Sequence, residues 1–388
     1  VWLSDVTFGA DPRHIDRELV PDPDRAAAEY VVATRGEGDC RAEAWVSGKT
    51  IQIRTMADIP SEQFKIVGLF YPGPTGRCAE NVSDVGLKLF GQLSDCRLIA
   101  LNGARITDDG LEYLKDMASL EVLSLVNAPI NGSGVRHLAQ LPRLTSLGID
   151  HAPVSDEQMP YIAALPKMTH LGIAGTRVTD AGLNELECHS ALTSISLDET
   201  RISDEGLQHL RDLPAGLHTI SLSTTNAPRG LVALEGCPIR SVKIVADGVK
   251  GTVNDSILES LKSFPDLTSL ALRNAVISIN VAKQIAMVER LSALQFETHY
   301  APSPIRDGAL KQLAKMPNLN YLLIASFAPL REAQLLELAG ATTLRSLNIY
   351  HVPLEAASVL KLQAALPNCK ITVDPEVQQA IDALRGKK

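Results

Sequence analysis

The histidines and cysteines are the residues of this chain that could bind a metal ion or act as nucleophiles. None of the nine histidines stands in H-E-x-x-H, and none of the six cysteines forms C-x-x-C. His170 and His218 fall on one face of two predicted strands that lie two repeats apart, about 10 Å from each other and too far for one ion. Cys188 and His189 are adjacent in the sequence, but nothing identifies a third catalytic partner. The sequence therefore predicts no metal, no cofactor and no catalytic site.

Other catalytic signatures are absent from the sequence too. It contains no G-x-S-x-G nucleophile elbow, no phosphate-binding P-loop and no set of protein-kinase motifs. Several cysteines are expected to be buried free thiols, as unpaired cysteines usually are. A disulfide remains an alternative for a chain that is exported, with Cys78 and Cys96 as the first pair to test. The six are Cys40, Cys78, Cys96, Cys188, Cys237 and Cys369.

Composition and charge limit the partners and the compartment. Acidic residues outnumber basic ones, 45 to 37, for a net charge of -8, which disfavours a nucleic acid because phosphate binding needs a basic stripe. No apolar run is long enough to span a membrane, and no export signal is recognisable. The sequence begins at Val1 rather than Met, which suggests a processed protein or part of a longer one. We expect a soluble chain of unknown compartment, with export and association with the cell envelope as the two alternatives left open.

A repeated unit is the dominant signal in the sequence. Five repeats begin 24 residues apart, at Cys96, Leu120, Leu144, Met168 and Leu192. The same frame continues less regularly, with two small insertions, from Leu217, Ile239, Leu267, Leu291, Leu319 and Leu344, and an irregular first unit starts at Phe64. About twelve coils are expected if each unit is one turn of a solenoid.

Each repeat predicts a short strand followed by a short helix. The segment L-x-x-L-x-L alternates apolar and polar residues, and G-L-x-x-L-x-x-L has helical spacing. Thr107 and Ser203 suit the N-cap position, and Asp108 and Asp204 suit the first turn, where the helix dipole favours an anion. We interpret the glycine that follows the aspartate as permitting the close approach of the next coil. One strand and one helix cannot close a core alone, so the units must stack.

These residues resemble the leucine-rich-repeat family over residues 64–373. The Ile-Thr-Asp-x-Gly-Leu version is similar to bacterial repeat proteins and to the repeat half of F-box proteins, but no F-box segment is recognisable. The resemblance implies an α/β horseshoe solenoid with a concave parallel sheet and convex helices. Where the family usually has asparagine, this chain has threonine or alanine, so Thr hydroxyls or water must satisfy the turn. These positions are Thr176, Thr200, Thr225, Ala104, Ala128, Ala152 and Ala275.

The segments outside the repeats are interpreted as a tail and two caps. Residues 1–22 are a tail or linker, and residues 23–62 form an N-terminal cap of a helix over Arg25–Thr34 and a hairpin of Arg41–Val46 and Thr50–Thr55. The solenoid covers 63–373. Residues 374–388 form a final helix, which is either a lid on the last coil or a partner-binding tail.

The predicted binding surface lies on the C-terminal coils. In the middle coils the exposed strand positions are small or polar, for example Thr145, Gly148 and Ser194. Aromatic residues are only 4% of the chain, yet a group of aromatic and histidine side chains gathers near the last strands and in the loop before them. They form either local packing or a partner-binding patch. The group consists of His299, Tyr300, Tyr321, Phe327, Tyr350 and His351. The loop Tyr71–Glu80 is a second candidate, with a tolerated surface insertion as its alternative.

The sequence therefore favours a non-enzymatic scaffold or recognition module that binds another protein. In one alternative, the chain is a regulatory or substrate-recruiting domain of a larger enzyme, such as a bacterial Ser/Thr kinase, because repeat arrays of this type accompany kinases in bacterial relatives. In another, it is a structural component of the cell envelope. The partner's identity and the oligomeric state stay open.

Overall fold

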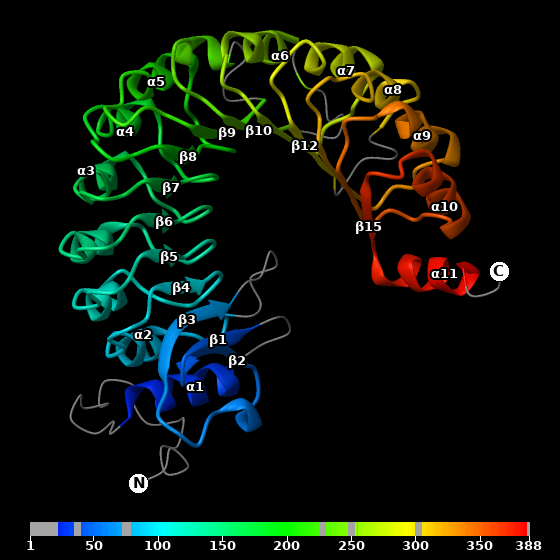
Figure 1. Cartoon of the computed structure of the whole chain (residues 1–388). Coiled ribbons are helices and arrows are strands. Elements are labelled where there is room, and N and C mark those ends of the chain that lie inside the picture. Colours follow the sequence, from blue (N-terminus) through cyan, green and yellow to red (C-terminus); the bar gives the residue numbers. More distant parts are fainter. Residues whose placement is uncertain are drawn as a thin grey trace. The chain divides into compact units, whose positions relative to one another are not determined.

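A computed structural model describes residues 22–34, 40–71, 79–224, 230–246, 253, 255–298 and 305–385. The chain forms two compact units, Val1–Arg177 with His189–Ala191, and Val178–Cys188 with Leu192–Lys388. In each unit the strands line one side of the coils and the short helices line the other (Figure 1).

The N-terminal segment of the first unit contains the predicted helix and hairpin. The elements are α1 (Pro23–Thr34), β1 (Arg41–Val46), β2 (Lys49–Ile53), the 3-10 helix η4 (Met56–Asp58) and β3 (Lys65–Tyr71). Strand β1 pairs antiparallel with both β2 and β3. The buried carboxylate of Asp24 joins the helix to β3, since it accepts hydrogen bonds from Ile66 N at 2.7 Å and from Lys65 Nζ at 3.0 Å. That these residues cap the first coil stays a prediction.

From β3 onwards, the strands of the first unit pair in parallel, in the order β3-β4-β5-β6-β7. Partner residues such as Leu98, Val122 and Ser146 are 24 residues apart, which confirms the predicted repeat frame. The elements are α2 (Asp84–Phe90), β4 (Leu98–Leu101), η5 (Asp109–Leu114), β5 (Val122–Ser124), η6 (Ser133–Leu138), β6 (Ser146–Gly148), η7 (Asp156–Gln158), α3 (Met159–Ala163) and β7 (His170–Gly172).

The second unit continues the same pattern with strands in the order β8 to β15, all parallel. Its register follows the predicted insertions, for example Ser241 opposite Ser269 and Ala293 opposite Tyr321. The strands are β8 (Ser194–Ser196), β9 (Thr219–Ser223), β10 (Ser241–Val245), β11 (Ser269–Arg273), β12 (Ala293–Thr298), β13 (Tyr321–Ser326), β14 (Ser346–Tyr350) and β15 (Lys370–Val373).

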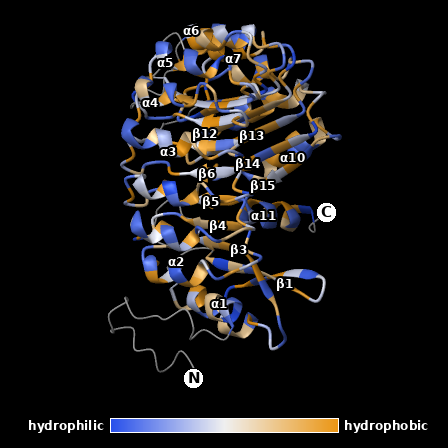
Figure 2. Ribbon diagram, turned by 90° about the vertical axis from the view of Figure 1, so that its left-hand side faces the viewer, coloured by the Kyte–Doolittle hydropathy of each residue, from blue (hydrophilic) through white to orange (hydrophobic). Residues whose placement is uncertain are grey.

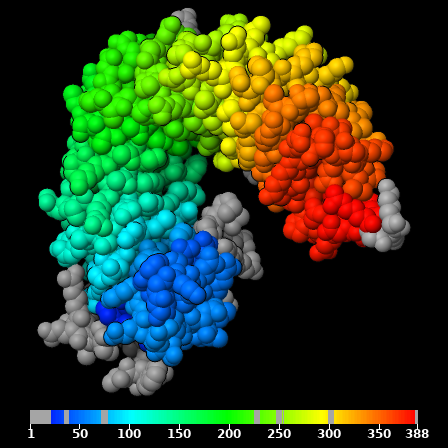
Figure 3. All heavy atoms as spheres, viewed as in Figure 1, coloured from blue at the N-terminus to red at the C-terminus, as the bar shows by residue number. Residues whose placement is uncertain are grey.

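Short helices connect the strands of the second unit. They are α4 (Asp180–Asn184), α5 (Asp204–Leu207), η8 (Gln208–Leu210), η9 (Gly230–Leu234), α6 (Asp255–Ser260), η10 (Leu261–Ser263), α7 (Ile279–Ile285), α8 (Ala309–Leu313), α9 (Glu332–Leu336), η11 (Glu337–Gly340), α10 (Ala356–Ala365) and α11 (Pro375–Arg385). Helix α11 buries Ile381 completely and packs against α10. In the space-filling view α11, red, closes against the orange and red coils before it (Figure 3).

Aliphatic side chains from successive coils form the core of each unit. In the second unit Ile195, Ile220, Val242 and Leu270 stand opposite one another on neighbouring strands, and each is at most 1% exposed. Hydrophobic residues, orange in Figure 2, recur along the strands and on the helices in the same way. This arrangement, with one parallel strand and one short helix per coil, is an α/β leucine-rich-repeat solenoid.

Threonine replaces the family's asparagine in the turn after the strand, as the sequence predicted. The Thr176 hydroxyl donates to Ile173 O at 2.6 Å, and the Thr200 hydroxyl donates to Leu197 O at 2.7 Å. Both side chains are buried, so these bonds satisfy carbonyls that water cannot reach. Thr225 lies outside the described residues.

The aspartates of the Ile-Thr-Asp motif lie at the start of a helix, and their carboxylates also accept hydrogen bonds from the next coil. Asp180 accepts hydrogen bonds from Ser203 N at 2.7 Å and from the Ser203 hydroxyl at 2.6 Å. Asp84 binds Thr107 in the same way, at 2.8 and 2.7 Å. Ser203 is an N-cap as predicted, since its hydroxyl accepts from Glu205 N. At the equivalent place in the earlier coil the 3-10 helix begins at Asp109, with Asp108 at its N-cap, and the Thr107 hydroxyl still accepts a hydrogen bond from Gly110 N at 3.3 Å.

The glycine of the motif makes room for this aspartate. A Cβ built on Gly206 would lie 2.0 Å from Asp180 Oδ1, and one on Gly110 would lie 2.1 Å from Asp84 Oδ1. The sequence interpretation was right about a close approach but wrong about its direction, because the glycine faces the preceding coil. Aspartate and glycine therefore form an intercoil pair, called here the Asp–Gly clamp.

We predict that Gly206→Ala destabilises the protein by about 1–3 kcal/mol, because the new methyl group collides with Asp180. Alanine itself favours helix over glycine by about 1 kcal/mol. In an Asp180→Ala background the same substitution should cost clearly less, because the contacts with Oδ1 at 2.0 Å and Cγ at 2.6 Å are removed and only the contact with Cβ at 3.0 Å remains. Denaturant unfolding of the four proteins measures this coupling. Gly340→Ala is the matched control, since a Cβ there meets no atom within 4 Å. Equal costs of Gly206→Ala in both backgrounds would contradict the clamp.

Candidate protein-binding surface

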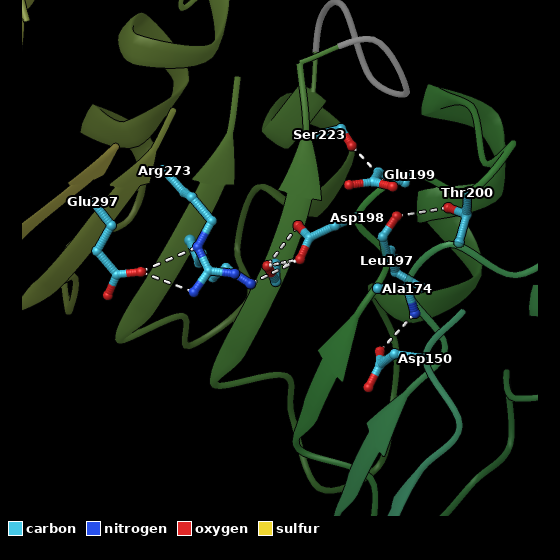
Figure 4. A network of polar contacts seen from close by, with 11 residues as sticks. Asp150, Ala174, Leu197, Asp198, Glu199, Thr200, Ser223, Arg273 and Glu297 are labelled. Carbon is cyan, nitrogen blue, oxygen red and sulfur yellow. Dashed lines mark hydrogen bonds and ion pairs between the residues drawn. The ribbon is translucent and has the colours of Figure 1, made fainter. Parts of the chain in front are cut away.

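On β6 and β7 of the first unit the solvent-facing positions are mostly small, as the sequence indicated for the middle coils. The positions that point away from the core include Ser146, Gly148 and Gly172. Asp150 Oδ1 accepts a hydrogen bond from Ala174 N at 2.8 Å (Figure 4). A Cβ on Gly172 would lie 2.5 Å from Asp150 Oδ2, so this carboxylate covers the glycine. Such a surface offers few side chains that could anchor a partner.

In the second unit the same side of the strands carries a charged network (Figure 4). The Asp198 carboxylate is almost fully buried. The Ser221 hydroxyl lies 2.6 Å from both carboxylate oxygens, to which it donates its single proton, and Lys243 Nζ forms an ion pair with Oδ2 at 2.9 Å. On the strand next to that of Lys243, Arg273 of β11 donates through Nε and Nη2 to Glu297 Oε2 of β12 at 3.1 and 2.8 Å. These groups satisfy one another and stiffen the surface.

Sequence reasoning missed this network. Part of its signal was available, because Lys243 stands between Ser221 and Ala271 at one strand position, and Glu297 stands beside Ala325 at another. What the sequence could not supply was the partner of each charge, which depends on which coil each long side chain reaches.

We predict that Lys243→Ala lowers the free energy of unfolding by about 1–3 kcal/mol, because it leaves the buried Asp198 carboxylate with only neutral donors. Arg290→Ala is the control: its pair with Asp266 is 67% and 50% exposed, and exposed pairs contribute only about 0–1 kcal/mol. Urea denaturation measures both. A Lys243→Ala protein as stable as the control would show that the ion pair contributes nothing.

The predicted aromatic group is only partly brought together. The Phe327 and His351 rings stack, with centroids 5.3 Å apart and planes 22° from parallel. Tyr321 opens β13, where its hydroxyl accepts a hydrogen bond from Asn348 Nδ2 at 3.3 Å, and Tyr350 ends β14. Both tyrosines are half-buried on the solvent-facing side, and Phe327 is 61% exposed. His299, Tyr300 and most of the loop Tyr71–Glu80 lie outside the described residues.

A hollow of about 740 Å³ lies beside the stacked rings. It is formed by the turns after β13 and β14 and by the start of α11. Sequence reasoning identified Phe327 and His351 but not the rest of the lining, which comes from the starts of α10 and α11. The lining residues are Phe327, His351, Val352, Pro353, Leu354, Glu355, Asp374, Pro375, Glu376 and Val377.

His351 itself adopts the left-handed backbone conformation, which fixes the position of its side chain. Its φ is +59°, and its N–H donates to Asp374 Oδ2 at 2.7 Å. His151 and Glu199 adopt the same conformation after their own strands, so this turn belongs to the coil rather than to the hollow. The regular turn thus sets the His351 ring against Phe327 and ties it to the residue that precedes α11.

His189 and Cys96, whose side chains could act in catalysis or metal binding, are buried in the protein. His189 is buried, and its Nε2 lies 2.8 Å from Leu165 O, so it serves the backbone rather than Cys188. Burial raises the pKa of the Cys96 thiol to about 12, which makes this group unreactive near neutral pH. Within the described residues, no His, Cys, Asp and Glu side chains gather in a metal-binding group. Cys78 lies outside the described residues, so the Cys78–Cys96 disulfide stays a prediction.

No helix among the described residues combines the length and the apolar character needed to cross a membrane.

Comparison with known proteins finds similarity only among solved structures. No protein-family model and no curated protein matches the chain. An internalin of Listeria monocytogenes is 16% identical, over 92% of this chain and 93% of that one, with a TM-score of 0.35. A leucine-rich-repeat protein of Leptospira interrogans is 16% identical, over 73% and 74%, with a TM-score of 0.36. TLR13, in a complex with a single-stranded RNA, is 17% identical, over 73% and 46%, with a TM-score of 0.42.

Proposed function

We propose that this chain is a non-enzymatic recognition module that binds another protein through its C-terminal coils. The binding surface would comprise the solvent-facing side of β13 and β14 together with the hollow beside Phe327. We assign the chain to the leucine-rich-repeat proteins of the Ile-Thr-Asp-x-Gly-Leu type, because its coils carry that motif at the helix start.

The observation that carries the proposal is the exposed aromatic ring of Phe327 at the edge of a hollow. Aromatic side chains that insert into a partner dominate the energy of protein interfaces, at about 2 kcal/mol or more for a hot spot. Phe327 is 61% exposed and is already oriented by its stack with His351, so little side-chain entropy remains to be lost on binding. Tyr321 and Tyr350 add half-buried rings on the adjoining strands.

The surroundings support one preferred surface. On β6 and β7 of the first unit the solvent-facing residues are Ser146, Gly148, His170 and Gly172. In the second unit the charges of Asp198, Lys243, Arg273 and Glu297 already pair with one another. The C-terminal coils combine exposed aromatic area with a concave site, which is the usual composition of a binding hot spot.

The final helix is better explained as a lid than as a partner-binding tail. The Ile381 side chain is fully buried and α11 packs against α10, so this helix covers part of the preceding coil. Leu384, in the next turn of the helix, is 40% exposed. We therefore keep the boundary of the solenoid near residue 373 as part of the proposal.

The test is comparative capture of proteins from the native source by immobilised chain, followed by mass spectrometry. We predict that a specific partner is retained by the unaltered protein and by Trp45→Ala, and lost by Phe327→Ala. Trp45 is the matched control because it is also an exposed aromatic, 50% exposed, on β1. With the purified partner, Phe327→Ala should weaken binding at least about tenfold, and Tyr321→Ala and Tyr350→Ala less.

Each variant should unfold within about 0.5 kcal/mol of the unaltered protein, since its side chain is exposed or half-buried. A partner held equally well by the unaltered protein and by all four variants would place the binding surface elsewhere and would overturn the proposal.

A further inference from the structure

We propose that the hollow beside Phe327 binds an arginine side chain of the partner protein. This inference rests on the proposed function and specifies the chemistry of the partner segment. The hollow combines two features that a guanidinium group recognises, an exposed aromatic ring and several carboxylates, and they come from three separate segments of the chain.

The charge of the hollow selects a cation. Glu355, Asp374 and Glu376 contribute three carboxylates, and the residues that line the hollow include neither lysine nor arginine. Glu355 and Asp374 directly precede α10 and α11, whose N-termini each contribute about half a positive charge. The sum remains near two negative charges, so the helix ends do not turn the hollow into an anion site. One carboxylate oxygen of Asp374 also accepts the His351 N–H, which holds this carboxylate at the hollow.

The cation is organic rather than a metal ion. A calcium or magnesium site needs several oxygen ligands within about 2.0–2.6 Å of one point. Within the described residues no group of acidic, histidine or cysteine side chains is close enough for this. Spread-out carboxylates around apolar walls, such as Val352 and Val377, suit a larger cation that carries a hydrocarbon stem.

Arginine fits better than lysine because of the stacked rings. Phe327 and His351 stack with their planes 22° from parallel, so each ring covers part of the other, and the Phe327 side chain remains 61% exposed as a flat platform at the edge of the hollow. A planar guanidinium can stack on such a platform and donate N–H groups to neighbouring carboxylates at the same time, whereas the ammonium of lysine is a point charge. The same kind of contact occurs within this chain, where Arg41 lies 4.4 Å from the centroid of the Phe70 ring.

The test uses fluorine NMR of the full chain labelled with 4-fluorophenylalanine, in which Phe327→Leu assigns one of the seven phenylalanine signals. The probes are blocked tripeptides with arginine, lysine, citrulline or glutamate between two glycines. We predict that the arginine peptide shifts the Phe327 signal saturably, that lysine binds several-fold more weakly and that citrulline, the neutral isostere, does not bind. Binding should also weaken as salt rises from about 0.05 to 0.5 M, because exposed charges are screened.

Charge variants test the role of the carboxylates. The double variant Glu355→Gln, Glu376→Gln preserves the shape of the hollow and should weaken arginine-peptide binding about tenfold, whereas Glu157→Gln, on the exposed helix η7 of the other unit, should not change it. Equal binding of citrulline and arginine, or stronger binding of the glutamate peptide, would overturn the inference. So would the absence of any arginine-dependent shift.

Partner capture separates this inference from the proposed function. If Phe327→Ala loses the partner but the double glutamine variant retains it fully, the protein-binding proposal stands and the arginine inference fails. If the arginine peptide binds but Phe327→Ala does not alter capture of any partner, the hollow is a cation site and the proposed protein-binding surface is wrong.

Discussion

No coil of this protein can bury its own aliphatic side chains, since one short strand and one short helix expose more aliphatic surface than they can cover. Burial of apolar area contributes roughly 25 cal/mol per Å², and a single coil has no interior in which to gain it. Stacking of the coils buries this surface, because residues such as Leu147 and Leu171 stand opposite each other on strands that are one period apart. The constraint explains why the buried strand positions change so little from coil to coil while the exposed ones vary.

Stacking also brings backbone polar groups together, and the Asp–Gly clamp satisfies them. Asp108 accepts hydrogen bonds from three backbone N–H groups of the following coil, at Asn131, Gly132 and Gly134. Such N–H groups at a helix start have no partner within the helix. The aspartate of one coil therefore caps the next one, and the glycine permits the approach. Regular spacing and intercoil capping are two consequences of one contact.

The repeats could be predicted from the sequence because their signal is periodic. Strand register, the insertions before β11 and β13, and the hydroxyl bonds of Thr176 and Thr200 all follow from the spacing of apolar residues and from the accounting of backbone hydrogen bonds. The direction of the clamp could not be predicted, because the helix dipole alone is enough to account for an aspartate at a helix start. Its second role appears only when the coils are placed side by side.

The binding surface was predictable in part for a related reason. Phe327 and His351 stood out because aromatic residues are rare in the chain. Glu355 and Asp374 did not, since acidic residues before helices recur throughout the repeats and have a scaffold explanation. Their convergence on one hollow depends on where α10 and α11 begin in space. A scaffold residue that also lines a site carries no separate signal in the sequence.

Removal of one whole coil tests the central claim most directly. Deletion of the 24 residues 144–167 joins Arg143 to Met168 and keeps the frame of the repeat. If coils are equivalent units that share an interior, this protein should fold, retain its circular-dichroism signature and unfold cooperatively, with a smaller unfolding enthalpy. Deletion of residues 144–155, half a period, should abolish folding. Two deletions with the same effect, both folded or both unfolded, would contradict the account.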